Sequence, residues 1–339
     1  MEKSDYVIDT HGAFVGKTSE RLVLKKKGNQ LDEQPLRLLR AILVSARGVS
    51  FSSSLVECCS EFQIPIEFLD YRRRAVARLS VPHPHKTVGT MRGQFDARFS
   101  SKGATVAKTM IREKLKSQKR LLNYHRRRAG TQQQALENRE VIRCAIDAID
   151  RRGGDVEEMR ASWMGIEGAA SRAYWQTMAQ TIGESAEFRG REHRGAEDLV
   201  NRMLNYGYAI LQSRVWGMIE RAGLHPFAGF LHEDRAGRPS LVLDLMEPWR
   251  IIVDDTVFSV VRQSGSRLPV DGLPDHFKYG VVDGVTDRLA VPGQYGQKQL
   301  PVRECMMEAI RNIGVYLRGD GALKPYRWNV RGPKEPRDN

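Results

Sequence analysis

Hydrophobic residues change their spacing part-way along this 339-residue chain, and the change limits which folds it can adopt. The opening segments YVID, AFVGKT and RLVLKK are short, rich in Val, Phe and Thr, and separated by glycines, which is typical of strands. From about Gly89 onward, apolar residues recur every three or four positions, most clearly over 199–222. This spacing predicts helices. We therefore expect an α+β protein with a small N-terminal β-rich domain and a larger all-α C-terminal domain.

The same patterns predict where the domains divide. Residues 1–80 are expected to form the β-rich domain, 81–90 a proline-bearing linker, 91–328 the helical domain, and 329–339 a disordered polar tail. The glycine-rich stretch 262–300 is expected to be a loop, with a hairpin at most. Helices are expected over residues 53–62, 104–126, 133–150, 157–181, 199–222 and 301–317.

Several protein classes are excluded or made less favourable by the sequence. No run of about 18 apolar residues is present, so a transmembrane helix is not expected, and the start MEKSDYVID lacks the apolar core of a signal peptide. The four cysteines include no CxxC pair, which argues against a disulfide framework and against a cysteine zinc site. We expect a protein of the reducing cytoplasm.

The distribution of charge favours a polyanionic partner. The chain has 54 Lys and Arg against 41 Asp and Glu, a net charge of +13, and its basic residues concentrate between Ser101 and Arg128, where Glu113 is the only acid. This segment indicates either a solvated helix face or a surface that binds nucleic acid; we favour the second, because we expect few carboxylates within helical reach. The residues expected to contact DNA are Lys114, Lys116, Lys119, Arg120, Arg126, Arg127 and Arg128.

Three places carry side chains that suit chemistry. Glu167 lies between Gly165 and Gly168 in a helical stretch, where glycines suggest a close backbone approach. His232 follows the long helix, and Asp244 and Glu247 stand three residues apart in an apolar run. Each has a simpler interpretation: a surface glutamate, a structural histidine, and a buried ion-pair network with Arg250.

Taken together, these acids and the imidazole suit a hard divalent ion, Mg²⁺ or Mn²⁺, and the imidazole moves the preference toward Mn²⁺. A carboxylate-bound ion beside a basic segment suggests phosphodiester chemistry. Neither a G-x-x-x-x-G-K-[ST] phosphate loop nor a G-x-S-x-G nucleophile motif occurs in the chain.

Three blocks extend this interpretation: GIEGAASRAYW, DLVNRMLNYGYAIL and GLHPFAGFLHEDRAGRPSLVLDLMEPWR. In order and spacing the chain resembles the CRISPR adaptation integrases, the larger protein of the spacer-acquisition pair. The resemblance also takes in Gln94, Lys114 and Gln118 and the β-rich start. It is weakest over 262–300 and the tail, and Arg189–Gly195 lacks the prolines common in that family.

The resemblance implies a dimerisation domain, a helical metal-dependent catalytic domain, and metal ligands at Glu167, His232 and Glu247, with Asp244 as a catalytic helper. Many relatives carry Asp where this chain has Glu247. The implied reaction is attack of a DNA 3′-hydroxyl on a phosphodiester at a repeat boundary. The implied partners are double-stranded DNA (prespacer and repeat array), a second copy of the chain, and a small ferredoxin-like adaptation protein.

Two other functions remain open at this point. The chain is alternatively a non-catalytic DNA- or RNA-binding protein in which Glu167, His232 and Glu247 form an ion-pair cluster. It is alternatively a transposon-type integrase relative that serves no CRISPR array.

Overall fold

The computed structural model describes residues 4–62, 64–70, 75–79, 88–125, 132–151, 153–154, 156–182, 186–192, 197–265 and 272–326. The chain divides into two compact units, Met1–His85 and Lys86–Asn339, each with its own hydrophobic core. This division falls inside the 81–90 stretch. No helix in the described ranges is both long and apolar enough to cross a bilayer.

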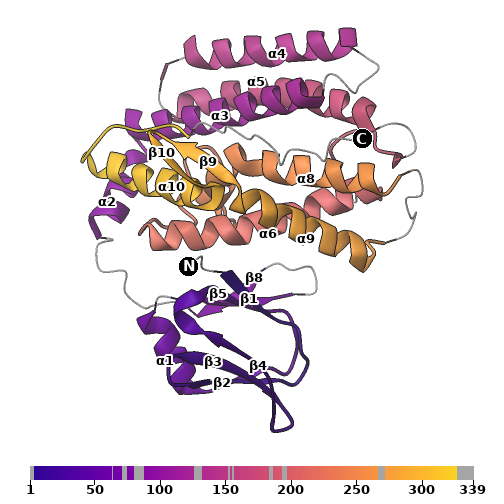
Figure 1. The fold of residues 1–339 in the computed structure, drawn as a ribbon. Helices are drawn as coiled ribbons and strands as arrows, with labels where there is room; N and C mark the ends of the chain where they lie inside the picture. Colours follow the sequence, from indigo (N-terminus) through magenta and orange to yellow (C-terminus); the bar gives the residue numbers. More distant parts are fainter. Residues whose placement is uncertain are drawn as a thin grey trace. The chain divides into compact units, whose positions relative to one another are not determined.

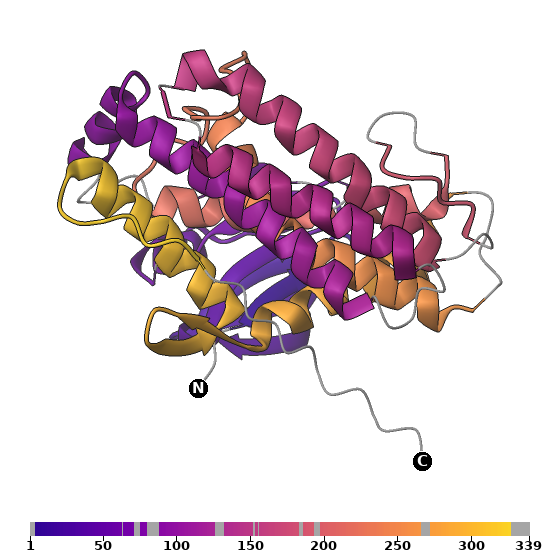
Figure 2. The same ribbon diagram turned by 90° about the horizontal axis from the view of Figure 1, so that it is seen from above.

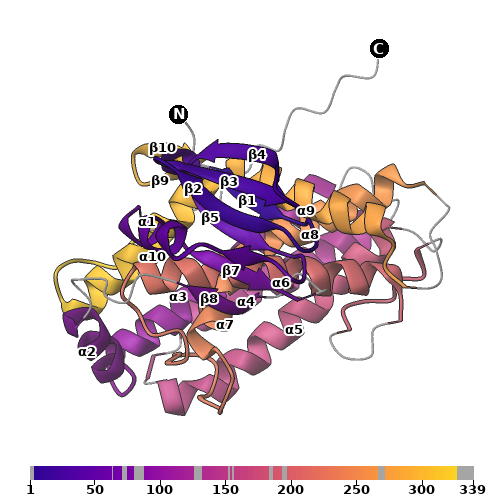
Figure 3. The same cartoon turned by 90° about the horizontal axis from the view of Figure 1, so that it is seen from below.

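In its described residues the N-terminal unit contains two four-stranded sheets and the helix α1, and Figure 3 labels all of these strands except β6. One sheet has the order β1-β5-β7-β8 and the other β4-β3-β2-β6. The tight turn between β3 and β4 places Lys27 and Gly28 at φ 50° and 85°, which a two-residue hairpin loop of the primed type requires. The elements are β1 (Ser4–Ile8), β2 (Phe14–Thr18), β3 (Arg21–Lys26), β4 (Asn29–Pro35), the 3-10 turn η1 (Leu36–Leu38), β5 (Leu39–Val44), β6 (Ser50–Phe51), α1 (Ser53–Glu61), β7 (Ile66–Leu69) and β8 (Ala75–Leu79).

The C-terminal unit is mostly helical (Figure 1). Helices α3, α4 and α5 pack against one another, as Figure 2 also shows, and α8 packs between them and the pair α6 and α9. The elements are α2 (Val88–Ala97), α3 (Ser101–His125), α4 (Gln132–Arg151), α5 (Val156–Ile182), α6 (Leu199–Arg221), α7 (Ser240–Met246), the 3-10 turn η3 (Glu247–Trp249), α8 (Arg250–Gln263), α9 (Asp275–Ala290), β9 (Pro292–Tyr295), β10 (Lys298–Pro301) and α10 (Val302–Arg318).

The predicted α+β class, with a β-rich start and a helical remainder, is confirmed. The second unit is not purely helical, because β9 and β10 form an antiparallel hairpin. The expectation of a loop over 262–300 is wrong for about half of its described length, since α9 occupies 16 of these residues. The glycines within α9 allow close packing against α8. A Cβ on Gly284 would lie 2.6 Å from Thr256 Cγ2 of α8, so α8 and α9 approach closely there.

Candidate active site

Helix α5 carries Glu167 with its side chain 20% exposed. One turn later on the same helix, the Ser171 hydroxyl donates a hydrogen bond of 2.6 Å to Glu167 Oε1, and this contact fixes the orientation of the carboxylate. The expectation of a close backbone approach at the flanking glycines is wrong for the described part of the chain. A Cβ on Gly165 would meet nothing there within 4 Å, and one on Gly168 only Arg172 Nη1 at 3.9 Å.

Glu247 stands at the junction of α7 and α8, where Pro248 follows it in the short turn η3. It is buried, and Arg250 Nε donates to its Oε1 at 2.8 Å. Burial opposes ionisation of Glu247, but the charges of Arg250 and Lys114 outweigh that effect and lower the pKa of this carboxyl to about 2. Glu247 is therefore a carboxylate at neutral pH.

Lys114 joins the two acids. Its Nζ lies 2.6 Å from Glu167 Oε1 and 2.6 Å from Glu247 Oε2. Burial alone would lower the pKa of Lys114, yet the charges of Glu247 and Glu167 raise it above its ordinary value. One ammonium group thus bridges carboxylates from α5 and η3, which are 80 residues apart in the sequence.

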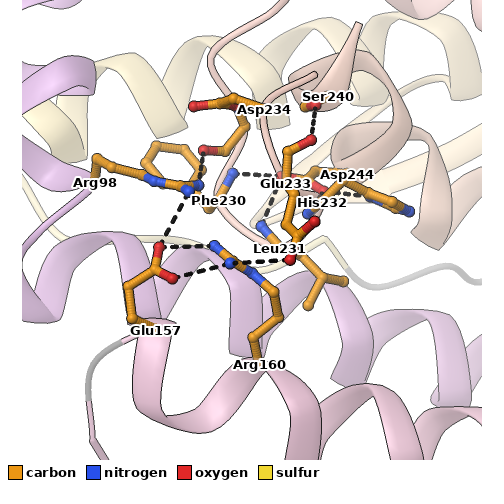
Figure 4. A network of polar contacts seen from close by, with 11 residues as sticks. Arg98, Glu157, Arg160, Phe230, Leu231, His232, Glu233, Asp234, Ser240 and Asp244 are labelled. Atoms are coloured by element: carbon orange, nitrogen blue, oxygen red, sulfur yellow. Dashed lines mark hydrogen bonds and ion pairs between the residues drawn. The ribbon is translucent and has the colours of Figure 1, made fainter. Parts of the chain in front are cut away.

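His232 is held by Asp244, as Figure 4 shows. Its Nδ1 lies 2.6 Å from Asp244 Oδ1, and the same carboxylate accepts hydrogen bonds from the backbone N–H groups of Phe230, Leu231 and His232. Asp244 therefore holds the backbone of residues 230–232 and also orients the imidazole ring of His232. With Nδ1 engaged, Nε2 is the ring atom left to face a metal or a substrate.

Ion pairs and a hydrogen bond hold the segment that carries His232 in place (Figure 4). Arg98, in the turn after α2, donates to Gly229 O at 3.2 Å and pairs with Glu157 of α5 at 3.0 Å. Arg160, one turn along α5, pairs with Glu157 at 3.0 Å and with Glu233 at 4.0 Å. These contacts tie residues 229–233 to α5 and to the turn that follows α2.

A cavity of about 170 Å³ opens beside the acids. Asp254, which is buried and also lines the cavity, accepts hydrogen bonds from Tyr174 and Tyr208. Burial raises the pKa of Asp254 to about 6 although these bonds oppose the shift. Three acidic and three basic side chains therefore line the same cavity: Glu167, Glu247 and Asp254, and Lys114, Arg191 and Arg250. The lining residues are Lys114, Ser117, Gln118, Glu167, Ser171, Trp175, Arg191, Tyr208, Glu247, Arg250, Ile251 and Asp254.

The positions of the predicted ligands bear directly on metal binding. Within the described ranges, no three His, Cys, Asp or Glu side chains converge as a ready-made metal centre. His232 faces Asp244, and Lys114 occupies the space between Glu167 and Glu247. The two carboxylates nevertheless converge on a single cation, and their oxygens are the ligands that Mg²⁺ and Mn²⁺ prefer. The acid pair therefore fits a hard divalent ion.

The predicted DNA-binding residues do not all lie in the same environment. Lys116, Lys119 and Arg120 lie partly exposed on α3, whereas Lys114 points into the acid pair, and Arg126, Arg127 and Arg128 fall outside the described residues. Few carboxylates lie within helical reach on α3 itself, where Glu113 is the only acid of its sequence, and distant elements supply other partners. For example, Arg112 reaches Asp150 at 3.5 Å.

Sequence reasoning misses three features of the cavity: Asp254, Tyr208 and the role of Lys114 between the acids. One signal exists for Asp254. Glu247, Arg250 and Asp254 follow the i, i+3, i+7 spacing of a single helical face, and all three line the cavity. No local pattern in the sequence indicates the partners of Lys114.

Comparison with known proteins places these features in a family. Residues 6–267 match the model for "CRISPR associated protein Cas1". A CRISPR-associated endonuclease Cas1 from Francisella tularensis subsp. novicida is 32% identical, with 94% of this chain and 98% of that protein covered. One from Pyrobaculum aerophilum is 36% identical, with 95% and 99% covered.

Solved structures show the same fold at lower identity. A casposase bound to integration product superposes with a TM-score of 0.78 at 20% identity, covering 96% of this chain and 95% of that chain. A CAS1 protein from Thermotoga maritima gives a TM-score of 0.72 at 17% identity, covering 93% and 97%. With the family match spanning most of the chain and relatives above 30% identity along nearly its whole length, the protein belongs to the Cas1 family of CRISPR-associated proteins.

Proposed function

We propose that this protein is a divalent-metal-dependent DNA integrase and endonuclease that inserts short DNA duplexes into a CRISPR array. One observation carries the proposal: Glu167 and Glu247, both in the helical unit, converge on a single cation beside a cavity lined by arginines. The names of the relatives, CRISPR-associated endonucleases, support the same chemistry.

The proposed reaction exchanges one phosphodiester for another. The 3′-oxygen of the incoming duplex forms a bond to phosphorus at the repeat boundary, and the bond from that phosphorus to the leaving 3′-oxygen breaks. The attacking hydroxyl gives up its proton, and the leaving 3′-oxygen takes one from solvent. The number of phosphodiester bonds is unchanged, so no nucleotide hydrolysis is required.

Residues of this chain have distinct roles in the proposal. Glu167 and Glu247 would hold the metal, and His232 would complete the ligand set through Nε2, with Asp244 orienting its ring. When bound, Mg²⁺ or Mn²⁺ would polarise the attacked phosphate and stabilise charge on its oxygens. Arg191 and Arg250 would attract the phosphodiester into the cavity, since both line it.

The charge balance of the cavity supports this assignment. Three cations and three acids line it, so the lining carries little net charge when the acids are ionised. A divalent ion would make it positive, and a positive enclosure favours a phosphodiester.

Outside the cavity, Lys116, Lys119 and Arg120, together with Arg126, Arg127 and Arg128, are proposed to hold the DNA backbone without reading its sequence. Lys114 differs from these residues in position, because its ammonium group faces the acids.

The proposed assembly is a homodimer through the β-rich unit, with two such dimers flanking a dimer of a small ferredoxin-like adaptation protein. The fold similarity to a chain of a "Cas6-RT-Cas1--Cas2 complex", with a TM-score of 0.73 at 18% identity, is compatible with such a partner. That chain is longer: this protein covers 36% of it.

One observation also fits a non-catalytic DNA-binding protein: Lys114 and Arg250 together balance the charge of the acid pair without any metal. A joining assay separates the two functions. Wild-type protein should join a labelled duplex to a repeat-bearing plasmid in Mn²⁺ or Mg²⁺, and poorly in Ca²⁺, whose looser coordination positions the phosphate less well.

In that assay Glu167→Gln should abolish joining while duplex affinity stays near wild type. The matched control is Glu158→Gln, which changes an exposed acid at the start of the same helix and should leave joining intact. Metal-independent joining, or full joining by Glu167→Gln, would refute the catalytic assignment.

A further inference from the structure

The oxygens around Lys114 are not equivalently bonded. Glu247 Oε1 accepts from Arg250, whereas Oε2 is buried and receives no hydrogen bond within the described chain. The cation beside Oε2 is Lys114 Nζ, at 2.6 Å. The two oxygens of Glu247 therefore face different cations, Oε1 facing Arg250 and Oε2 facing Lys114.

Glu167 presents its own oxygen to the same point. Its Oε1 accepts the Ser171 hydroxyl and lies 2.6 Å from Lys114 Nζ. The ammonium group thus sits where oxygens of two acids converge, and a hard divalent ion would take the same position at about 2.0–2.2 Å from each oxygen. Both cations cannot occupy it, because their charges would repel strongly at such a separation.

The cavity offers the ammonium group another place. Lys114 lines it together with Ser117 and Gln118, which lie three and four residues further along α3. A lysine side chain has four rotatable bonds and is able to swing its charge without moving the helix. Displacement from the acids therefore does not require the core to rearrange.

We propose that Lys114 is a built-in counter-cation that occupies the metal position in the metal-free protein and competes with the divalent ion for Glu167 and Glu247. The inference rests on the proposed function in one respect, that these two acids are metal ligands. It adds a regulatory role: without metal, the lysine occupies the position between the two acids and, together with Arg250, balances their charge, and it lowers the metal affinity of the site.

The test compares Mn²⁺ affinity in purified full-length variants, measured from the electron paramagnetic resonance signal of free Mn²⁺. Lys114→Met removes the charge and retains most of the side-chain volume, so it should bind Mn²⁺ roughly tenfold more tightly than wild type, a gain equal to about 1.4 kcal/mol. Lys114→Arg keeps the charge and should show no gain. Lys108→Met, on the same helix but with its ammonium group on Asp150 O at 2.7 Å, is the matched control and should bind Mn²⁺ as wild type does.

Thermal stability gives a second readout. Without metal, Lys114→Met leaves the partly exposed Glu167 and the buried Glu247 facing each other with no cation between them, so its melting temperature should fall below that of wild type. Mn²⁺ should then raise it by more than it raises wild type, because the ion replaces the missing charge. If the variant folds only with metal, the Mn²⁺ concentration that restores folding becomes the measured quantity.

Several results would overturn the inference. Equal or weaker Mn²⁺ binding by Lys114→Met would mean that the lysine does not compete. A variant that millimolar Mn²⁺ cannot fold would make Lys114 a structural group that metal does not replace. These outcomes differ from failure of the proposed function: wild type that joins DNA in Mn²⁺ while Lys114→Met binds no tighter contradicts the inference alone, whereas tighter binding without joining by wild type contradicts the function alone.

Discussion

At the scale of single residues, Asp244 does more than assist the other acids. Its carboxylate accepts three backbone hydrogen bonds and one from the His232 ring. Asp244→Ala would leave three N–H groups without their acceptor, each costing about 1–3 kcal/mol if it stays buried. We expect a clear loss of stability together with loss of joining, measured by denaturant unfolding and the joining assay. Asp244→Asn, which keeps an acceptor oxygen, should lose less stability; equal stability of Asp244→Ala and wild type would contradict this role.

Asp254 predicts a dependence of stability on pH. Its pKa is raised from 3.8 to about 6 in the folded chain, so between these values the folded state binds more protons than the unfolded state. Its contribution to stability is therefore present at low pH and is lost as the pH rises through about 6, a change on the order of 1–3 kcal/mol.

Asp254→Asn cannot titrate and should lack that slope. The measurement is the free energy of unfolding at several pH values between 4 and 7 for wild type, Asp254→Asn and the exposed-site control Asp283→Asn. Wild type and the control should lose stability relative to Asp254→Asn as the pH rises. Parallel curves for all three proteins would contradict the assignment.

The sequence is sufficient to single out Glu167, His232, Asp244 and Glu247, because polar side chains in apolar or glycine-rich surroundings are conspicuous. It cannot place Lys114 between two acids. Those contacts join residues 53 and 133 positions apart, and only the packing of α3 against α5 and η3 brings them together. Long-range pairing of this kind leaves no trace in local spacing.

At the scale of elements, a regular apolar stripe predicts a helix to within a few residues; α6, expected over 199–222, spans Leu199–Arg221. Helix α9 is not predicted, because its glycines resemble those of a loop and a loop is expected there. In α9, Gly280 and Gly284 instead face Val260 and Thr256 of α8. A glycine used for close helix packing and a glycine used for a turn look alike in one sequence.

Two glycine substitutions distinguish these uses. Gly284→Ala would place a Cβ 2.6 Å from Thr256 Cγ2 and should destabilise the protein by about 1–3 kcal/mol. Gly165→Ala meets nothing within 4 Å and should stabilise α5 by about 0.5–1 kcal/mol through helix propensity. Unfolding in urea measures both, and a stabilising Gly284→Ala would contradict the close crossing of α8 and α9.

Helix α3 carries the proposed contacts with DNA. Neutralising Lys116, Lys119 and Arg120 together should weaken duplex binding alike on all sequences. It should also flatten the dependence of log affinity on log salt by about 0.9 for each phosphate that the protein no longer neutralises. Fluorescence anisotropy across a salt series measures this slope. Unchanged affinity and slope would mean that this part of α3 is only a solvated face.

At the scale of the whole molecule, the N-terminal unit leaves apolar side chains uncovered. Val76 and Leu79 on β8 are 66% and 45% exposed, and Val7 on β1 is 43% exposed. Both strands end the order β1-β5-β7-β8, and sheet edges with apolar side chains favour pairing with another chain. This arrangement supports the proposed homodimer.

Charged substitutions on β8 test the dimer. Val76→Asp combined with Leu79→Asp should shift the mass measured by analytical ultracentrifugation from dimer to monomer at micromolar concentration. Val141→Asp, which changes a residue with the same 43% exposure as Val7 but on α4, is the control and should leave the dimer intact. A monomeric wild type, or a dimer that persists in the double variant, would contradict the proposal.

The most direct test of the account is whether Glu167 and Glu247 act together on one ion. The measurement is the rate of duplex joining in Mn²⁺ for Glu167→Gln, Glu247→Gln and the double variant, alongside bound Mn²⁺ per chain. If the acids share one ion, each single variant should lose at least about a hundredfold in rate and most of the bound Mn²⁺, and the double variant should be no worse, since residues that act as a unit are not additive. Near-wild-type joining by either single variant, or losses that multiply in the double variant, would contradict it.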